Sequence, residues 1–473
     1  MTHLKTSITF KFVIFLVFIS LISLSPSLNI IPKILIETSF HDSQRLLELL
    51  LIALILLHSI IFRSQNSYFT AIPNIRYAFY VLITLAIASA YLAKSPRHAI
   101  IEVSLFSGLS YLTLFVVNLY HENNTRLIKW LTYAFWAGIL LSMVSFYVGY
   151  ITATTFSTPL VWPNPLTGFS NIRSFNQYQL WTLGLITLPL LTLDFKSAQT
   201  RRYLHFGLVC WWVLLFYSAS RGALLAWLVG LLATAVIYRK LAWPFIRLQL
   251  MHITAGFISY QILFKFIPNL RGSALVTGTI MRDTSSDRLE LWRLCIAIIQ
   301  DHPIFGVGPM HFAWVSQTSA HPHNSVLQIM AEFGLPAALI ILAMAFYGLR
   351  CWLKRFSLKN LQADTTLNST LAIVLFFTIV TNAAYSLVDG VIVMPISQVM
   401  LFTFIGLMIA FYSHGHVVEV KRKSVLMPIM AGVVLIALIS STLPEILQSA
   451  SGSEKRFSMA YTASGPRIWL ELK

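Results

Sequence analysis

Residues 319–340 combine groups suited to proton transfer with the start of an apolar run. They read S-A-H-P-H-N-S-V-L-Q-I-M-A-E-F-G-L-P-A-A-L-I. His323 precedes the apolar run, and a neutral imidazole can take a proton from an attacking hydroxyl near neutral pH. Asn324 follows it as a predicted helix N-cap. Asn324, Gln328 and Glu332 recur every fourth residue, which predicts one polar stripe facing a water-filled cavity or a partner.

Two other interpretations of the histidines are open. His323 could be an interfacial histidine that bonds only a loop carbonyl. His321 and His323 could instead bind a metal, because residues i and i+2 of an extended segment share a face. No Cys, His or carboxylate set at ligand spacing completes such a site. We therefore expect catalysis by His323 with no metal and no other cofactor.

Two arginines stand where apolar runs begin. Arg221, in Y-S-A-S-R-G-A-L-L-A-W, has small neighbours and lies at a predicted helix start, where a guanidinium can bind an anion. The alternative is a side chain that only anchors the helix at the membrane surface. Arg173 lies with Asn176 and Gln179 in N-I-R-S-F-N-Q-Y-Q, a cluster that could bind a sugar or a phosphate or form a polar turn.

Two more charged residues lie in predicted loops. Arg288 precedes a Leu-rich run with helical period over residues 289–299, and it could instead pair with Asp287 or Glu290. Asp389, in S-L-V-D-G-V-I-V-M-P, falls in a short turn, which by itself explains an Asp-Gly pair. A carboxylate there could also tune His323 or pair with an arginine.

The elements that must position these residues are membrane spans. The chain of 473 residues is 57% hydrophobic and 11% charged, whereas a soluble domain is about 25% charged. Its mean hydropathy is +0.73. The net charge of +17 is expected to anchor loops at the membrane and not to bind nucleic acid. Cys210, Cys295 and Cys351 fall in different regions and predict no disulfide framework.

The sequence predicts an all-α polytopic membrane protein with about 12–13 transmembrane helices, since a span needs roughly 17–25 apolar residues. The candidate spans are 9–27, 46–62, 77–93, 99–118, 128–150, 176–193, 203–218, 222–238, 249–267, 324–348, 368–386, 392–412 and 425–442. We divide the chain into a first bundle (1–267), an amphipathic loop or cap (268–323), a second bundle (324–442) and a tail (443–473). The basic N-terminal run, which resembles a signal peptide, is interpreted as an uncleaved first span.

Charge orients this set of spans. Basic clusters are dense in the loops after the sixth, eighth, tenth and twelfth spans, which predicts a cytoplasmic N-terminus. The five residues Arg173, Arg221, Arg288, His323 and Asp389 then all lie at the outer face. Guanidinium groups and a histidine beside lipid suit a lipid-linked diphosphate, whose leaving-group charge they would stabilise.

These residues resemble the O-antigen ligase superfamily. The resemblance rests on S-R-G-A, the long outer loop and H-N-S-V-L-Q-I-M-A-E-F-G, which starts at His323, and it covers roughly residues 165–400. The superfamily comprises lipopolysaccharide O-antigen ligases, O-antigen polymerases and protein O-oligosaccharyltransferases. It implies a GT-C-like enzyme of the bacterial inner membrane with a periplasmic active site. Such an enzyme moves glycan from undecaprenyl diphosphate to an acceptor.

The resemblance assigns the base to His323 and the essential arginines to Arg221 and Arg288. The short C-terminal region favours lipid A–core as the acceptor, while N-I-R-S-F-N-Q-Y-Q keeps an acceptor protein open. An O-antigen polymerase and, from another class, a transporter or flippase are further alternatives. The predicted catalytic residues are His323, Arg221 and Arg288, and the predicted substrate-binding residues are Arg173, Asn176, Gln179, Asn324, Asp389 and Gln328.

Overall fold

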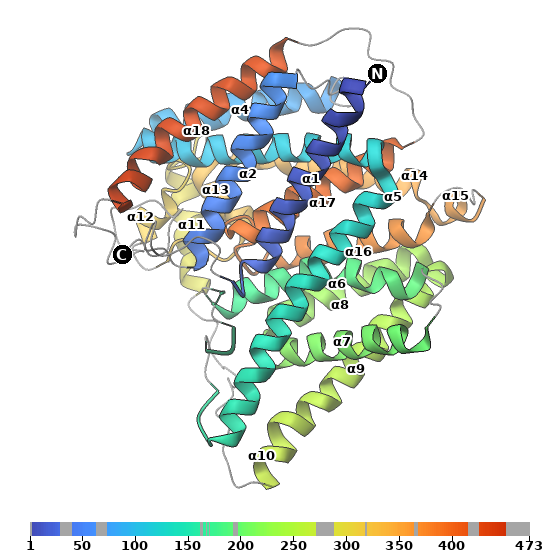
Figure 1. Ribbon diagram of the computed structural model, residues 1–473. Helices are drawn as coiled ribbons and strands as arrows, with labels where there is room; N and C mark the ends of the chain where they lie inside the picture. The colour runs from blue at the N-terminus through green and yellow to red at the C-terminus, as the bar shows by residue number, and fades with distance from the viewer. Residues whose placement is uncertain are drawn as a thin grey trace.

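Helices make up the protein (Figure 1). The structure is a computed structural model that describes residues 2–28, 40–62, 73–160, 164–166, 168–169, 171–192, 197–270, 288–316, 319–363, 368–414 and 425–450. No strand occurs within these ranges. Residues 271–287 of the expected cap, which include Asp287, lie outside these ranges. Residues 451–473 of the expected tail also lie outside them.

The structure describes twenty helical elements, which follow one another along the chain. In chain order they are α1 (Thr2–Leu24), α2 (Phe40–Phe62), α4 (Pro73–Leu92), α5 (Pro96–Thr155), η1 (Asn164–Leu166), α6 (Ile172–Thr192), α7 (Ala198–Tyr217), α8 (Arg221–Tyr238), η2 (Arg239–Ala242), α9 (Trp243–Gln261), η3 (Ile262–Phe266), α10 (Ile267–Leu270), α11 (Arg288–Asp301), α12 (Phe312–Ser316), α13 (Ser325–Phe333), α14 (Leu335–Arg355), α15 (Leu358–Ala363), α16 (Ser369–Tyr385), α17 (Pro395–Ser413) and α18 (Leu426–Ala450).

The protein is an all-α polytopic membrane protein, as the composition predicts. Helix overlaps each of the thirteen expected spans. Seven helices of the described residues are long and apolar enough to cross a membrane. Three shorter apolar helices cover 11–24, 76–92 and 369–385. The seven include one continuous stretch, 221–270, that joins two expected spans, and the two halves of α5. Those halves meet at a kink at Asn123 and run in different directions (Figure 1).

The expected single span over 324–348 is instead two helices, α13 and α14. They meet at Gly334, whose φ of +86° favours glycine. A Cβ at Gly334 would lie 2.0 Å from the carbonyl oxygen of Ile304, so the chain comes too close there for any side chain. Pro336 then stands in the first turn of α14, where no N–H is needed. The polar stripe therefore lies on a nine-residue helix and not on a membrane span.

Helix α13 packs against α11 and α12 through one small apolar cluster. Its buried residues are Leu291, Cys295, Ile298, Phe312 and Ala331. Helix α11 confirms the predicted helix over residues 289–299. Figure 1 shows α11, α12 and α13 together.

Helix α16 packs against both α6 and α8, and α17 packs against α2 and α5. The end of α16 therefore meets the starts of α6 and α8, and we call this side of the bundle the site end. The last helix, α18, continues eight residues beyond the expected span, to Ala450. All three cysteines are free.

Candidate active site

His323 lies at the site end in a strained backbone conformation directly before α13. Its φ is +54°, a region that costs a non-glycine residue about 1–3 kcal/mol. The side chain of Asn324 accepts hydrogen bonds from the backbone N–H groups of Val326 and Leu327, both at 3.0 Å, which confirms the predicted N-cap. The N–H of Ser325 donates to the carbonyl of Ser386 at 2.8 Å. These bonds hold the strained turn in place.

The imidazole of His323 lies between a guanidinium and a carboxylate. Nη1 of Arg173 is 2.8 Å from Nε2 and 3.3 Å from Nδ1, and Oδ1 of Asp389 is 3.3 Å from Nδ1. Because a guanidinium can only donate, Nε2 accepts from Arg173. Nδ1 then carries the proton and donates it to Asp389. The ring is therefore held as the neutral tautomer that a general base needs.

Electrostatics keep this ring neutral. Burial lowers the pKa of His323, and the positive charges of Arg173 and Arg288 lower it further, while Asp389 raises it. Burial alone would raise the pKa of Asp389. Its hydrogen bond with His323, the imidazoles of His323 and His321, and the nearby Tyr385 outweigh burial and bring that pKa to about 2. At neutral pH the pair is thus an imidazole beside a carboxylate.

Two more arginines face the same place. Burial lowers the pKa of Arg288, as do the charges of Arg173 and Arg221, whereas Asp389 and Tyr385 raise it, so all four groups lie close to Arg288. The group nevertheless stays charged, because an arginine pKa begins above about 12. Nε of Arg288 is buried and has no hydrogen-bond partner among the residues that the structure describes.

Arg221 begins α8 and is exposed. The hydroxyl of Ser220 caps this helix by accepting from the N–H of Ala223. At Gly222 a Cβ would contact Val388 at 3.3 Å and Tyr385 at 3.5 Å, so the start of α8 lies against the turn that carries Asp389. The neighbourhood of Arg288 therefore holds three guanidinium groups, its own included, and the carboxylate of Asp389, and this excess of positive charge suits an anion.

Three predicted substrate-binding residues lie elsewhere. Asn176 is buried and donates to Ser218 at 2.7 Å and to Gln179 at 3.0 Å, and Gln179 donates to the carbonyl of Trp211. These bonds join α6 to α7. Gln328 donates to Glu332 at 3.3 Å, and Glu332 accepts from the N–H of Phe312 at 3.1 Å, so this part of the stripe joins α13 to α12. None of these bonds reaches His323.

His321, considered in the sequence only as a metal ligand, lies directly against His323. The two ring centroids are 4.2 Å apart, and the N–H of His323 donates to Nδ1 of His321 at 3.3 Å. Gly390 allows this arrangement, because a Cβ there would come within 2.5 Å of the His321 ring. Among the described residues, no group of three His, Cys, Asp or Glu side chains could hold a metal ion.

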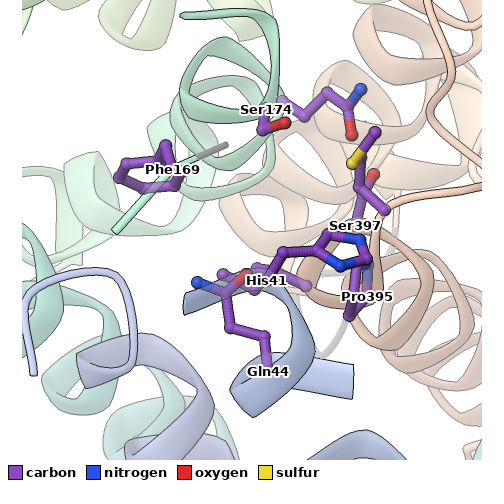
Figure 2. A pocket seen from close by; sticks show the side chains of 9 residues that line it. His41, Gln44, Phe169, Ser174, Pro395 and Ser397 are labelled. Atoms are coloured by element: carbon purple, nitrogen blue, oxygen red, sulfur yellow. The ribbon is translucent and has the colours of Figure 1, made fainter. Parts of the chain in front are cut away.

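Two further features of the site were not predicted from the sequence. Tyr385, which ends α16, lies beside Asp389 and Ser220. A small polar pocket lies between the start of α2, the turn before α17 and α6 (Figure 2). Its lining includes His41 and Gln44 of α2, and Ser174, the residue after Arg173. The polar run F-H-D-S-Q-R, directly before the expected second span, was the sequence signal that could have indicated the pocket. No pattern in the sequence pointed to Tyr385.

A comparison with known protein families matches part of the chain that carries the candidate site. Residues 206–342 match the family model described as O-antigen ligase. This match supports the O-antigen ligase superfamily, as the motifs predicted. A search of curated proteins found no match to the chain. The segment that matches the O-antigen ligase family contains Arg221, Arg288 and His323, while Arg173 and Asp389 lie outside it.

Proposed function

We propose that this protein is a glycosyltransferase of the bacterial inner membrane that moves an O-antigen glycan from undecaprenyl diphosphate to lipid A–core at the periplasmic face. One observation carries the proposal. His323 contacts both Arg173 and Asp389, and Arg288 lies near them with a buried donor, Nε, that has no partner among the described residues. A neutral base beside several guanidinium groups suits transfer from a diphosphate leaving group.

Arg221 and Arg288 would hold the diphosphate. A guanidinium presents several N–H groups in a planar fork, so it matches two phosphate oxygens at once. Asp389 compensates only part of the positive charge around Arg288. The diphosphate would supply the missing negative charge, and it would gain most from the arginines as its leaving-group charge develops.

His323 would act on the acceptor hydroxyl. The hydroxyl oxygen attacks the anomeric carbon from the side opposite the diphosphate, and its proton passes to Nε2 of His323. The bond between the anomeric carbon and the diphosphate oxygen breaks, and the electron pair leaves with the diphosphate, so the configuration inverts. In the structure Nε2 accepts from Arg173. Arg173 would have to turn toward the bound phosphate before His323 can accept the proton.

The distribution of basic residues supports a periplasmic site. Helix α8 starts with Arg221 at the site end and, at roughly 1.5 Å per residue, ends about 27 Å away at Arg239 and Lys240. Helix α14 likewise ends with Lys354 and Arg355. Basic residues at the far end of the bundle indicate that this end faces the cytoplasm.

Contacts of Glu332 favour an enzyme over a transporter. A transport pathway would need this carboxylate to face a polar channel. Its two oxygens instead interact with Phe312 and Gln328.

The test is glycan transfer by purified protein from undecaprenyl-diphosphate glycan, with EDTA present. Lipid A–core and a pilin-type protein are offered separately, and the His323→Ala variant is measured beside the wild type. Labelled lipid A–core, lost in the variant, is the expected result. Labelled protein would move the proposal to protein O-glycosylation. Transfer to neither acceptor by folded wild-type protein would exclude both and leave polymerisation or transport.

A further inference from the structure

We propose that Arg45, held by Glu48, is a positioning residue that fixes the turn carrying Asp389 and through it the His323 imidazole. This inference rests on the proposed role of His323 as the base. Arg45 and Glu48 lie on α2, far in sequence from the segment that matches the O-antigen ligase family.

Arg45 is a buried guanidinium with three acceptors from two parts of the chain. Its exposed fraction is 2%, and that of Glu48 is 0%. Nη1 donates to the Glu48 carboxylate at 2.5 Å and also to Oε1 of Gln398. Nη2 donates to the carbonyl oxygen of Val393 at 2.6 Å. Gln398 in turn donates to the carbonyl of Ile392 at 2.8 Å.

The bonds from Arg45 end on the turn between α16 and α17. The N–H of Val393 donates to the carbonyl of Gly390 at 3.1 Å, and the N–H of Gly390 donates to Oδ1 of Asp389 at 2.7 Å. That same Oδ1 faces Nδ1 of His323 at 3.3 Å. Hydrogen bonds and the backbone of the turn therefore connect Arg45 on α2 to the imidazole of His323.

Without Arg45, few side-chain bonds would hold this turn. Residues 389–393 are buried or partly buried, yet Val391, Ile392 and Val393 are apolar and cannot bond a neighbouring helix through their side chains. A buried ion pair is weak evidence for stability, because apolar residues of similar volume often replace one without loss. We therefore attribute the burial of Arg45 to a positioning role, in which its guanidinium fixes the carbonyl of Val393.

The variant that separates placement from folding is Arg45→Met with Glu48→Met. It leaves no unpaired buried charge, so the chain is expected to fold, while Val393 loses its donor. Arg45→Lys is the second variant, which keeps the charge beside Glu48 but cannot fork to two acceptors. Tyr111→Phe is the matched control, since the Tyr111 hydroxyl also bonds a distant backbone carbonyl, that of Met427 at 2.8 Å.

The first measurement does not need transferase activity. Purified full-length protein is treated with diethyl pyrocarbonate, which modifies neutral imidazoles, and modification of His323 is followed by mass spectrometry as a function of pH. The groups facing His323 are Asp389, Arg173, Arg288 and His321. If the Asp389 turn loosens, His323 loses the one neighbour that raises its pKa. The titration midpoint should then fall to lower pH in the double variant and stay unchanged in the control.

The second measurement is glycan transfer. We expect kcat per folded molecule to fall about 10- to 100-fold in the double variant and less in Arg45→Lys, because small displacements of a catalytic group have effects of this order. The donor KM should stay near the wild-type value. The inference would be overturned if the folded double variant had the kcat of the wild type and the same titration midpoint of His323. If wild-type protein transfers nothing, the proposed function fails, while the midpoint still decides whether Arg45 positions His323.

Discussion

Nη1 of Arg173 donates to Nε2 of His323 across 2.8 Å, so the atom that would accept the substrate proton is already occupied. The bond joins α6 to the loop before α13. The donor diphosphate would compete with His323 for the Arg173 guanidinium, because a phosphate is a charged acceptor and Nε2 is a neutral one. On the proposed mechanism, donor binding would therefore draw Arg173 away and free Nε2 of His323 to accept a proton.

Replacing Arg173 should shift the pH dependence of transfer. The Arg173 charge lowers the pKa of His323, so Arg173→Met should raise that pKa and move the acid limb of the kcat/KM profile to higher pH. Arg173→Lys keeps a charge and should leave the limb close to that of wild type. The pH profiles of kcat/KM for both variants, measured at donor concentrations well below KM, check this, because kcat/KM reports the donor-free protein. An identical acid limb in Arg173→Met and wild type would contradict the contact.

Asp389 acts in the opposite direction. It raises the pKa of His323, so Asp389→Asn should lower it. Because a general base works in its neutral form, activity is lost as pH falls through this pKa, and the acid limb of the variant should therefore lie at lower pH than that of wild type. Its maximal kcat should also fall, since the tautomer is no longer fixed. A limb that moves to higher pH would be incompatible with this role.

Removing the base should reduce transfer about 10²- to 10⁴-fold. His323→Ala should show this loss in kcat and retain donor binding, because the arginines remain. His302→Ala is the control, since His302 is an exposed histidine between α11 and α12. Equal kcat values for the two variants would exclude His323 as the base.

Lysine should not replace the arginines that bind the diphosphate. Arg221→Lys and Arg288→Lys retain charge but lose the planar fork, so both should have strongly reduced kcat/KM. Arg202→Lys, at an exposed position in α7, should behave as wild type. Donor titrations of the three variants test the clamp, and near-full activity in Arg221→Lys would show it to be wrong.

Gly390 should tolerate no side chain. A Cβ there would lie 2.5 Å from the His321 ring, which would push His321 against His323. Gly390→Ala should therefore lower kcat by about 10-fold or more. A Cβ at Gly432 meets nothing within 4 Å, so Gly432→Ala serves as the control for the same chemical change. Thermal unfolding of both variants separates misfolding from misplacement.

Much of the site could be predicted, because membrane topology alone brings the ends of distant spans together. Arg173, Arg221, Arg288, His323 and Asp389 were expected at one face. The structure places Arg173, Arg288 and Asp389 near the His323 imidazole, and Arg221 near Arg288. The N-cap by Asn324 could also be predicted, because its side chain bonds only the backbone N–H groups two and three residues later.

Other contacts depend on partners that periodicity does not identify. The spacing of Gln328 and Glu332 predicted a shared face but not that this face meets α12. Asn176 and Gln179 lie near Arg173 in sequence, yet on α6 they face α7. The break at Gly334 depends on the approach of the Ile304 carbonyl, which comes from a distant segment. The bond from Arg45 to Val393 spans 348 residues, and no local pattern contains it.

The segment that matches the O-antigen ligase family ends at residue 342 and starts at 206. Grafting that segment from one relative into another would carry the proposed diphosphate-binding arginines and the proposed base in a single piece. The guanidinium that occupies the base and the carboxylate that orients it would still come from the recipient, because Arg173 and Asp389 flank the segment on either side. A chimera of this kind should therefore bind donor in the manner of its insert and show the pH response of its host.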